Sequence, residues 1–333
     1  MTNNILELYS GIGGMHCAWN EANLPGEIVT AIDINTVANH VYKHNFPSIN
    51  LQARNIQSIT PVEIEKLKVN VILMSPPCQP FSRNGKYLQE NDARTNSFLY
   101  IISILDQLES LEYILMENVK GFESSTVRDT FIEKLKNCNF LYQEFLVCPS
   151  TVGIPNSRLR YYCLARRTQQ KWNLQPVDEI LHRLPKEYDE PKSIEHYIEN
   201  NVPETEYLVP DKFLKKAYIF DICYKKSARS CCFTKAYSHY IEGTGSFLTN
   251  STEEDAKQCL IKAKNFEAGS SEFVECIKEL NLRFFTPTEI LGIMAFPKKY
   301  QFPKDVTRKQ CYRLLGNSIN VKVVSELLKI LFN

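Results

Sequence analysis

The sequence predicts an α/β fold in which helices cover both faces of a mostly parallel, doubly wound sheet, with a small irregular domain attached. Three observations support this prediction. Short apolar runs alternate with helix-like segments through the first half of the 333-residue chain. The regularity is lost after about residue 167 and returns near residue 284. Hydrophobic residues make up 44% of the chain, which is enough to bury a sizeable core.

Strands and helices alternate in the order expected for parallel strands joined by helical crossovers. Apolar runs of strand length predict strands at 4–9, 27–32, 69–74, 113–116, 142–148 and 160–165. Helical periodicity predicts helices at 15–22, 36–45, 97–108 and 127–137. Such alternation is typical of a sheet with helices on both faces.

The pattern in the second half of the sequence predicts that the chain has two domains. Residues 168–283 have weak periodicity and read as a small domain. Regular structure resumes with a helix start at Thr286-Pro287, a cap followed by proline in the first helical position, and a last helix at about 321–331. We therefore assign 1–167 together with 284–333 to one large domain.

Composition restricts the possible partners. The net charge of +1 excludes a broad basic surface, so any nucleic-acid contact must use local patches, such as the lysines within 212–226. The sequence shows no apolar run of the roughly 18 residues that cross a bilayer, and no signal peptide. None of the 11 cysteines forms a Cys-x-x-Cys pair. We expect a protein with reduced thiols, no metal and no membrane contact, in the cytoplasm and the nucleus.

A glycine-rich turn follows the first predicted strand. Gly11-Ile12-Gly13-Gly14 links strand to helix, and Asp33 ends the next strand about 20 residues later. Glycines allow a ligand close to the backbone, and a carboxylate in that place often holds ribose hydroxyls. His16 stands where a third glycine would complete a dinucleotide pattern, so the turn favours another nucleoside cofactor or is a tight turn alone.

Three further strand ends carry reactive side chains. Cys78 follows Pro76-Pro77, which would hold the thiol in one place; it is either a nucleophile or a buried structural cysteine. Glu117 follows another strand and is either a general acid, base or base-edge ligand, or a cap of the turn. Arg158 and Arg160 lie on one side of an extended segment and either bind a phosphate or base edge, or are solvated charges.

Together these segments resemble the cytosine-C5 methyltransferase family. Gly11 to Gly14 is similar to its cofactor loop, Pro76-Pro77-Cys78-Gln79 to its nucleophile motif, and Glu117-Asn118-Val119 to its glutamate motif. Asn156 to Arg160 resembles its Gln-x-Arg-x-Arg motif, with Asn156 in place of Gln. Leu315-Gly316-Asn317-Ser318 resembles its last motif, which completes the cofactor pocket.

The resemblance implies a methyl transfer from S-adenosylmethionine to C5 of cytosine, which leaves S-adenosylhomocysteine. It implies that the large domain is catalytic and the small domain recognises the target. Cys78, Glu117, Arg158 and Arg160 are the expected catalytic residues, and Asn118 and Lys235 are expected to contact the substrate. The expected cofactor residues are Tyr9, Ser10, Gly11, Ile12, Gly13, Gly14, Asp33, Ile34, Asn55, Ile56, Pro77, Ser97, Asn317 and Ser318. Tyr9 stands where most of the DNA enzymes have Phe, and Asn55-Ile56 where Asp-Ile is common.

Within the family, the chain is most similar to the DNA methyltransferase 2 group, which methylates cytosine 38 in the anticodon loop of tRNA-Asp. Arg94 to Phe98, Gly153 to Arg158, Cys232-Phe233-Thr234-Lys235 and Tyr240 to Gly245 carry this similarity. The resemblance implies tRNA, chiefly tRNA-Asp, as the partner of a monomer, with weak binding to DNA. A DNA cytosine-C5 methyltransferase is the main alternative; a catalytically silent nucleic-acid binder and a nicotinamide dehydrogenase fit the set of motifs less well.

Overall fold

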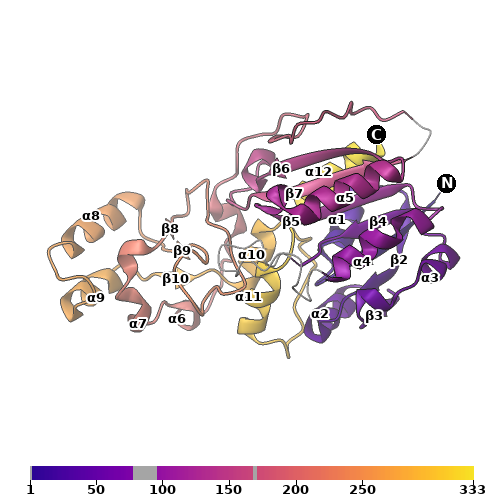
Figure 1. Cartoon of the computed structure of the whole chain (residues 1–333). Coiled ribbons are helices and arrows are strands. Elements are labelled where there is room, and N and C mark those ends of the chain that lie inside the picture. Colours follow the sequence, from indigo (N-terminus) through magenta and orange to yellow (C-terminus); the bar gives the residue numbers. More distant parts are fainter. Residues whose placement is uncertain (1, 78–95, 168–170) are drawn as a thin grey trace.

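The computed structural model describes residues 2–77, 96–167 and 171–333. Its larger part is a seven-stranded sheet in the order β3-β2-β1-β4-β5-β7-β6, with helices on both faces (Figure 1). The strands are β1 (Asn3–Leu8), β2 (Gly26–Ile32), β3 (Leu51–Gln52), β4 (Val71–Met74), β5 (Tyr113–Val119), β6 (Leu141–Val147) and β7 (Arg160–Arg166). Neighbouring strands from β3 to β5 are parallel, whereas β7 is antiparallel to β5 and β6. The predicted fold class is confirmed.

Alternating side chains divide the core into two layers, one on each face of the sheet. Ile5 and Leu73 face a core that they share with α1, α2 and α12, whereas Leu6 and Met74 face α4 and α5. Because both faces are buried, these strands are apolar at nearly every position. The helices of this part are α1 (Gly14–Ala22), α2 (Thr36–Asn45), α3 (Pro61–Lys66), α4 (Asn96–Ile104), α5 (Thr126–Asn137) and α12 (Val321–Phe332).

Most predicted elements are present, but short ones escaped prediction. The helix expected at 97–108 is α-helical only to Ile104 and ends in a 3₁₀ turn at Leu105–Gln107. The six-residue helix α3 was not predicted, although Thr60 and Glu63 form a capping box and Pro61 opens the helix. No helix of the described residues is both long enough and apolar enough to span a bilayer.

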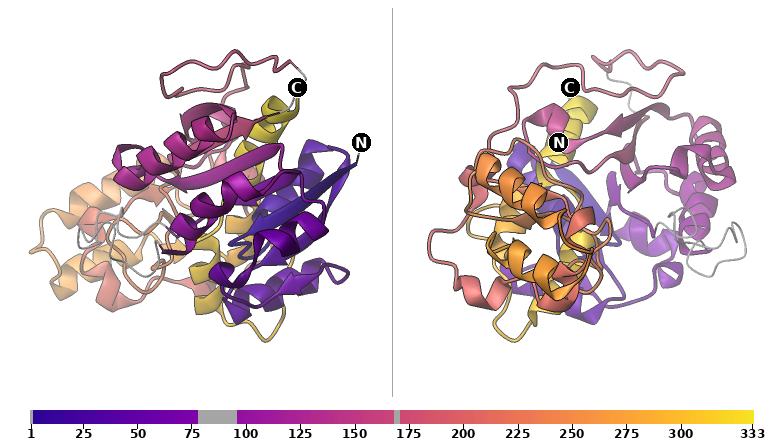
Figure 2. Two further views of the ribbon diagram at one scale, coloured as in Figure 1. Left: turned by 45° about the vertical axis from the view of Figure 1, so that its right-hand side comes forward. Right: turned by 90° about the vertical axis from the view of Figure 1, so that its left-hand side faces the viewer.

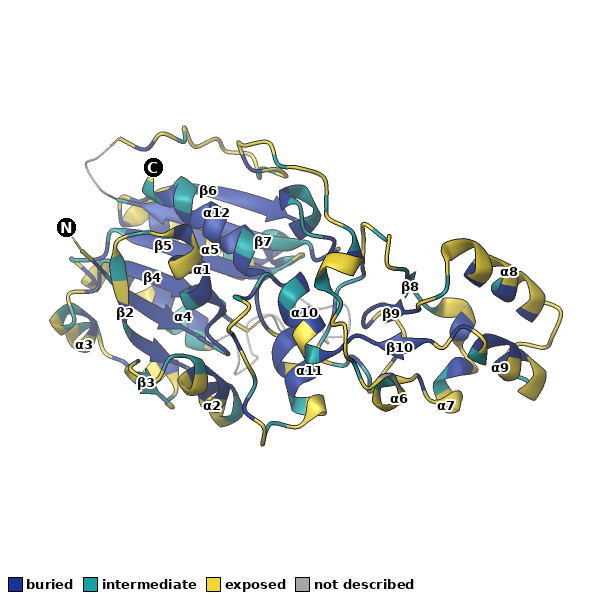
Figure 3. Ribbon diagram, turned by 180° about the vertical axis from the view of Figure 1, so that it is seen from behind, coloured by how far each residue is buried: buried dark blue, intermediate teal, exposed yellow. Residues whose placement is uncertain are grey.

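The small part is more regular than the sequence predicts. It contains a three-stranded sheet in the order β10-β9-β8 and a pair of packed helices, α8 and α9. Both helices have a buried face and an exposed face (Figure 3). Residues 231–245 have no helix, as expected. The elements are α6 (Glu204–Tyr207), α7 (Asp211–Leu214), β8 (Ile222–Cys223), β9 (Phe247–Leu248), α8 (Glu253–Ala263), α9 (Ser271–Lys278) and β10 (Arg283–Phe284).

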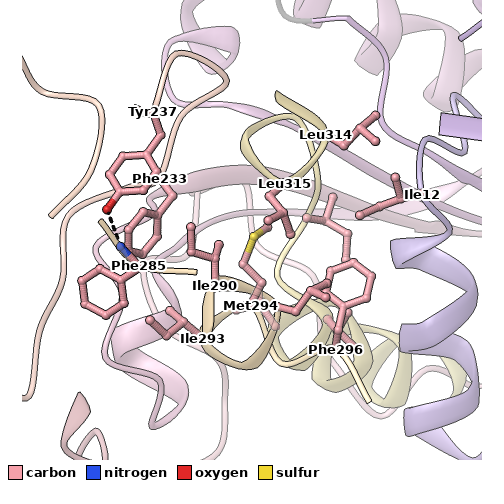
Figure 4. Close-up of a cluster of buried hydrophobic side chains, with 14 of the residues drawn as sticks. Ile12, Phe233, Tyr237, Phe285, Ile290, Ile293, Met294, Phe296, Leu314 and Leu315 are labelled. Atoms are coloured by element: carbon pink, nitrogen blue, oxygen red, sulfur yellow. Dashed lines mark hydrogen bonds between the residues drawn. The ribbon is translucent and has the colours of Figure 1, made fainter. Parts of the chain in front are cut away.

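Helices α10 (Pro287–Ile293) and α11 (Arg308–Gly316) lie between the two parts. A buried cluster joins them to the small part: Phe233 and Tyr237 meet Phe285, and the Tyr237 hydroxyl accepts a hydrogen bond from the Phe285 N–H at 2.9 Å (Figure 4). Tyr237 also makes an edge contact with Tyr312 of α11. One continuous core therefore extends from the large sheet into the small part.

Residues 171–184 form a strap that runs back along the large sheet (Figure 2). Trp172 donates from Nε1 to the Ile330 carbonyl at 2.7 Å, and Leu181 exchanges backbone hydrogen bonds with Leu146 and Glu144 of β6. These contacts attach the strap to the large sheet, although the sequence-based division assigns it to the small domain. The division at residues 168 and 283 stays a prediction.

Candidate active site

A cavity of about 380 Å³ opens beyond the carboxyl ends of β1 and β4. The strand order reverses between these two strands, and open α/β sheets bind ligands at such points. The wall includes residues from the large sheet, from the C-terminal motif and from the small part. The predicted site residues that line it are Tyr9, Ser10, Gly11, Ile12, Gly14, Asp33, Ile34, Pro77, Glu117, Asn118, Arg158, Arg160, Lys235, Asn317 and Ser318.

The structure places four of the predicted cofactor residues outside this wall. Gly13 caps α1 with a φ of 80° and backs onto the Tyr42 ring. Asn55 caps a 3₁₀ turn, and Ile56 is buried in the core beneath α4. Ser97 contacts the cavity-lining Tyr9, whose hydroxyl donates to Ser97 Oγ at 3.1 Å. The predicted nucleophile Cys78 lies outside the described residues.

The turn after β1 is held open towards the cavity by its backbone. Tyr9 has a φ of 56°, which is a costly conformation for an aromatic residue, and its carbonyl accepts a hydrogen bond from Ser75 Oγ at 3.2 Å. Gly11 also has a positive φ, of 52°. A Cβ on Gly11 would have no neighbour closer than 4.0 Å, so this turn faces open space that a ligand can approach.

Asp33 connects the turn to β2. Its Oδ2 accepts a hydrogen bond from the Gly11 N–H at 2.8 Å, and its Oδ1 accepts one from the Asn35 N–H at 2.7 Å. Burial raises the pKa of Asp33, and these two backbone donors oppose that shift. Because a carboxylate has about four lone-pair sites, the side chain can hold the turn and still accept hydrogen bonds from a ligand hydroxyl.

A buried polar network beneath this turn was not predicted. Glu7 is fully buried on β1, and its Oε2 accepts a hydrogen bond from the Tyr42 hydroxyl at 2.5 Å. Burial raises the pKa of Glu7 to about 8. The Tyr42 hydroxyl also lies 2.9 Å from His16 Nδ1, and the His16 ring stacks on Phe46. The available signal was a single carboxylate between the apolar residues Leu6 and Leu8.

Glu117 and Arg160 form the opposite side of the cavity. Arg160 Nε lies 3.5 Å from Glu117 Oε1, and both side chains are largely buried. Burial raises the pKa of Glu117, while the charges of Arg160 and Arg158 oppose this shift. The pair therefore places a buried carboxyl group, which can donate or accept a hydrogen bond, at the wall of the cavity.

Arg158 has a different environment from Arg160. Its guanidinium donates hydrogen bonds to the carbonyl oxygens of Phe233 and Gly316, each at 3.2 Å, and to the carbonyl of Ser318. It also donates to Cys232 Sγ at 3.3 Å. Arg158 thus joins the small part to the C-terminal motif, and its charged head contacts protein groups.

Asn156 extends this junction. Its Nδ2 donates to Ser230 Oγ at 3.1 Å and to the Cys231 carbonyl at 3.0 Å. Ser230 Oγ in turn donates to the Pro155 carbonyl at 2.7 Å. The sequence left the role of Asn156 open; in the structure it holds the small part against the start of β7.

The cofactor side has features that fit a nucleoside with a further polar group. Ile34 is 71% exposed, so it offers an apolar surface for a flat base. Ser10 Oγ is buried and has no hydrogen-bond partner among the described residues, so it is free to bind a polar ligand group. Asp33 supplies the acceptor for ribose hydroxyls.

The site was only partly foreseen. The wall also includes residues that we did not predict to act there: Met15, Asn35, Ala38, Ser75, Pro76, Val119, Leu314, Gly316 and Ile319. Several flank a predicted motif, so motif extension would have found them. Cys232, beside both arginines, belongs to a segment that the sequence analysis tied only to the tRNA group.

Known proteins share both the sequence and the architecture. Residues 3–333 match the family model described as C-5 cytosine-specific DNA methylase. A tRNA (cytosine(38)-C(5))-methyltransferase of Spodoptera frugiperda is 66% identical over the full length of both chains, and one of Homo sapiens is 41% identical over 98% of each. The structure of this chain matches a crystal structure of a Spodoptera frugiperda DNMT2 mutant over the full length of both chains, with a TM-score of 0.94 and 65% sequence identity. The chain therefore belongs to the cytosine-C5 methyltransferase family, whose members are enzymes that use S-adenosylmethionine.

Proposed function

We propose that this protein transfers a methyl group from S-adenosylmethionine to C5 of cytosine 38 in the anticodon loop of tRNA-Asp. The main support is a single cavity in which the glycine-rich turn and Asp33 face the Glu117–Arg160 pair. S-adenosylmethionine bound on the first side and a cytosine bound on the second would be in contact within this cavity. The names of the full-length relatives from Spodoptera frugiperda and Homo sapiens support the choice of tRNA.

The cofactor wall would bind the donor through groups of complementary chemistry. Asp33 would accept hydrogen bonds from the ribose hydroxyls, and Ile34 would contact the adenine. Ser10, Asn317 and Ser318 would contact polar groups at the other end. When bound, S-adenosylmethionine supplies an electrophilic methyl group on a sulfonium, and the protein supplies its position.

The substrate side would activate the cytosine. The Cys78 thiolate adds to C6, which gives C5 the electron density to attack the methyl group. Glu117 would hydrogen-bond N3 and the exocyclic amine, and Arg160 would contact O2. A base then removes the proton from C5, and the electrons of that C–H bond restore the C5–C6 double bond as the bond from C6 to Cys78 breaks.

RNA fits this site better than duplex DNA. The target base must leave its stack to reach Cys78, and an anticodon loop lowers that cost because its bases are already unpaired. The net charge of +1 provides little general attraction to a long duplex. We propose that a monomer holds the tRNA through Lys235 and the lysines within 212–226.

A competition assay with labelled S-adenosylmethionine tests this proposal. We expect tRNA-Asp to accept methyl groups far faster than duplex DNA at every salt concentration, and tRNA-Asp with uridine at position 38 to accept none. Faster methylation of duplex DNA would assign the chain to the alternative function, a DNA cytosine-C5 methyltransferase. Equal labelling of the uridine variant would show that another cytosine is the target.

A further inference from the structure

We infer that Gly316 is a positioning residue that makes two parts of the cavity depend on each other. One is the loop that carries Thr234 and Lys235, here called the recognition loop. The other is the cofactor wall, formed by the turn after β1, Asp33 and residues 317–318. The peptide between Thr234 and Lys235 lies directly on the last turn of α11. A Cβ added to Gly316 would lie 2.0 Å from the Lys235 nitrogen and 2.2 Å from the Thr234 carbonyl carbon. No side chain fits there, so the contact requires glycine at this position.

Neither side of this contact can move away easily. On the loop side, the buried rings of Phe233 and Tyr237 flank the peptide, and the Thr234 N–H donates to the Thr244 carbonyl at 2.8 Å. Tyr237 also packs edge-on against Tyr312 of α11. On the helix side, the Gly316 carbonyl accepts a hydrogen bond from Arg158 at 3.2 Å.

The contact connects two groups of cavity residues. Lys235 lines the substrate side, whereas Asn317 and Ser318 follow Gly316 directly and line the cofactor side. A second close contact continues the chain of packing, because a Cβ on Gly14 would lie 2.7 Å from Ile319 Cγ1. These two close contacts, Gly14 on Ile319 and Gly316 on the peptide before Lys235, connect the start of α1 to the recognition loop.

This packing has a consequence for binding. A cofactor that orders residues 317–319 also fixes Gly316 and thereby Lys235. If the proposed RNA substrate contacts Lys235, we expect the cofactor to strengthen RNA binding, and RNA then strengthens cofactor binding by the same factor. We rest this step on the proposed function.

Calorimetry with S-adenosylhomocysteine tests the coupling. For the unaltered protein we expect saturating tRNA-Asp to tighten S-adenosylhomocysteine binding about fivefold or more, within the usual range of such coupling. Gly316→Ala should reduce this factor to below about twofold and raise KM for tRNA more than it lowers kcat. Unchanged coupling in Gly316→Ala, or none in the unaltered protein, overturns the inference.

Gly292→Ala provides a matched control. Gly292 is also a helical glycine, but its added Cβ would have ordinary contacts, at 3.5 Å from the Tyr197 ring. Alanine is intrinsically better than glycine in a helix, so helix propensity disfavours neither substitution, and the two differ in the contact that the added Cβ makes. We expect Gly292→Ala to retain the full coupling factor, and loss of coupling there would contradict the special role of Gly316.

Hydrogen exchange provides a measurement that needs neither a variant nor RNA. We expect S-adenosylhomocysteine to slow amide exchange in residues 234–237 of the unaltered protein, although Lys235 lies outside the expected cofactor contacts. Unchanged exchange there overturns the inference even if Gly316→Ala does not fold. If exchange responds but tRNA-Asp is not methylated, the contact stands and the proposed substrate is wrong.

Discussion

The cavity has a cofactor wall, described above, and a recognition wall formed by Glu117, Arg158, Arg160 and Lys235. The two walls are held in place by different contacts. On the cofactor wall, the Gly11 N–H donates to the carboxylate of Asp33, which is 22 residues away. The recognition wall depends on a side chain that reaches far along the sequence, since Arg158 binds groups 74 to 160 residues away. The turn and Asp33 therefore belong to one βαβ unit and are joined later by residues 317–318, whereas the recognition wall exists only after the whole chain has folded. Substitutions on the two sides should therefore fail in different ways.

The largest expected effect comes from a substitution that removes the proposed nucleophile and leaves both walls of the cavity unchanged. Cys78→Ala should abolish methyl transfer, because no other group would add to C6, while S-adenosylhomocysteine binding persists. A labelled-methyl assay and calorimetry measure the two properties. Clear turnover by Cys78→Ala would rule out the covalent mechanism.

The arginine pair tests whether the recognition wall is structural or catalytic. Arg160→Ala should lower kcat/KM by roughly ten- to a hundredfold, the scale of losing a charged hydrogen bond in a transition state. Arg158→Ala should lower it at least as far, because it releases the carbonyls that hold the recognition wall in place. Only Arg158→Ala should also lower the free energy of unfolding strongly, by about 3–5 kcal/mol, because it leaves buried carbonyls unpaired.

Denaturant unfolding measures this difference. For Arg160→Ala we expect a loss of about 1 kcal/mol. Among the described residues, its Nη1 donates to the adjacent Leu159 carbonyl, its Nη2 lies 3.7 Å from Cys232 Sγ, and its Nε lies 3.5 Å from Glu117 Oε1. Equal destabilisation by the two substitutions would contradict the separate roles that we assign to them.

A substitution in the cofactor wall should have a smaller and more selective effect. Asp33→Ala removes a charged acceptor, which typically costs about 1.5–3 kcal/mol, so S-adenosylhomocysteine affinity should fall roughly ten- to a hundredfold. The exposed Asp305 provides the control, since Asp305→Ala should leave the affinity unchanged. Unchanged affinity in Asp33→Ala would mean that this side chain only holds the turn.

The smallest expected effect concerns pH and the network beneath the same wall. The folded protein favours protonated Glu7, whose pKa is raised to about 8, whereas the unfolded chain titrates near 4.5. The contribution of Glu7 to stability is thus fully present below pH 4.5 and is lost as the pH rises through about 8. Glu7→Gln should reduce this pH dependence, as unfolding curves from pH 5 to 9 would show. The same slope in both proteins would contradict a buried, protonated Glu7.

The sequence predicts the cofactor wall better than the recognition wall for a physical reason. Gly11 and Asp33 lie at the ends of consecutive strands, and parallel strands bring such ends together whatever the side chains are. By contrast, nothing near Arg158 in the sequence indicates that it binds the Phe233 and Ser318 carbonyls. Helix α8 escaped prediction in part because Ile261 is exposed and interrupts its polar face. Helix α9 carries a clear signal that the sequence analysis did not use, since Ser270 caps it and its apolar residues share a buried face.

Local packing explains why two residues that we predicted to bind the cofactor do not line the cavity in the described structure. Asn55 and Ile56 were assigned by resemblance to a motif, but Asn55 caps a turn and Ile56 is buried. A motif identifies a position along the chain, while the direction of a side chain depends on local packing. Glu7 and Tyr42 are the reverse case, because their pairing carries no motif and depends on burial alone.

The strap along β6 has a consequence for solubility. An edge strand presents unpaired N–H and C=O groups to which another chain can add, and β6 is at one edge of the large sheet. Leu181 occupies the edge groups of Glu144 and Leu146, and Gln143 Nε2 donates to the Glu179 carbonyl at 2.8 Å. The strap thus leaves less of this edge available for intermolecular strand pairing, so cleavage within it would expose an aggregation-prone surface on an otherwise intact sheet.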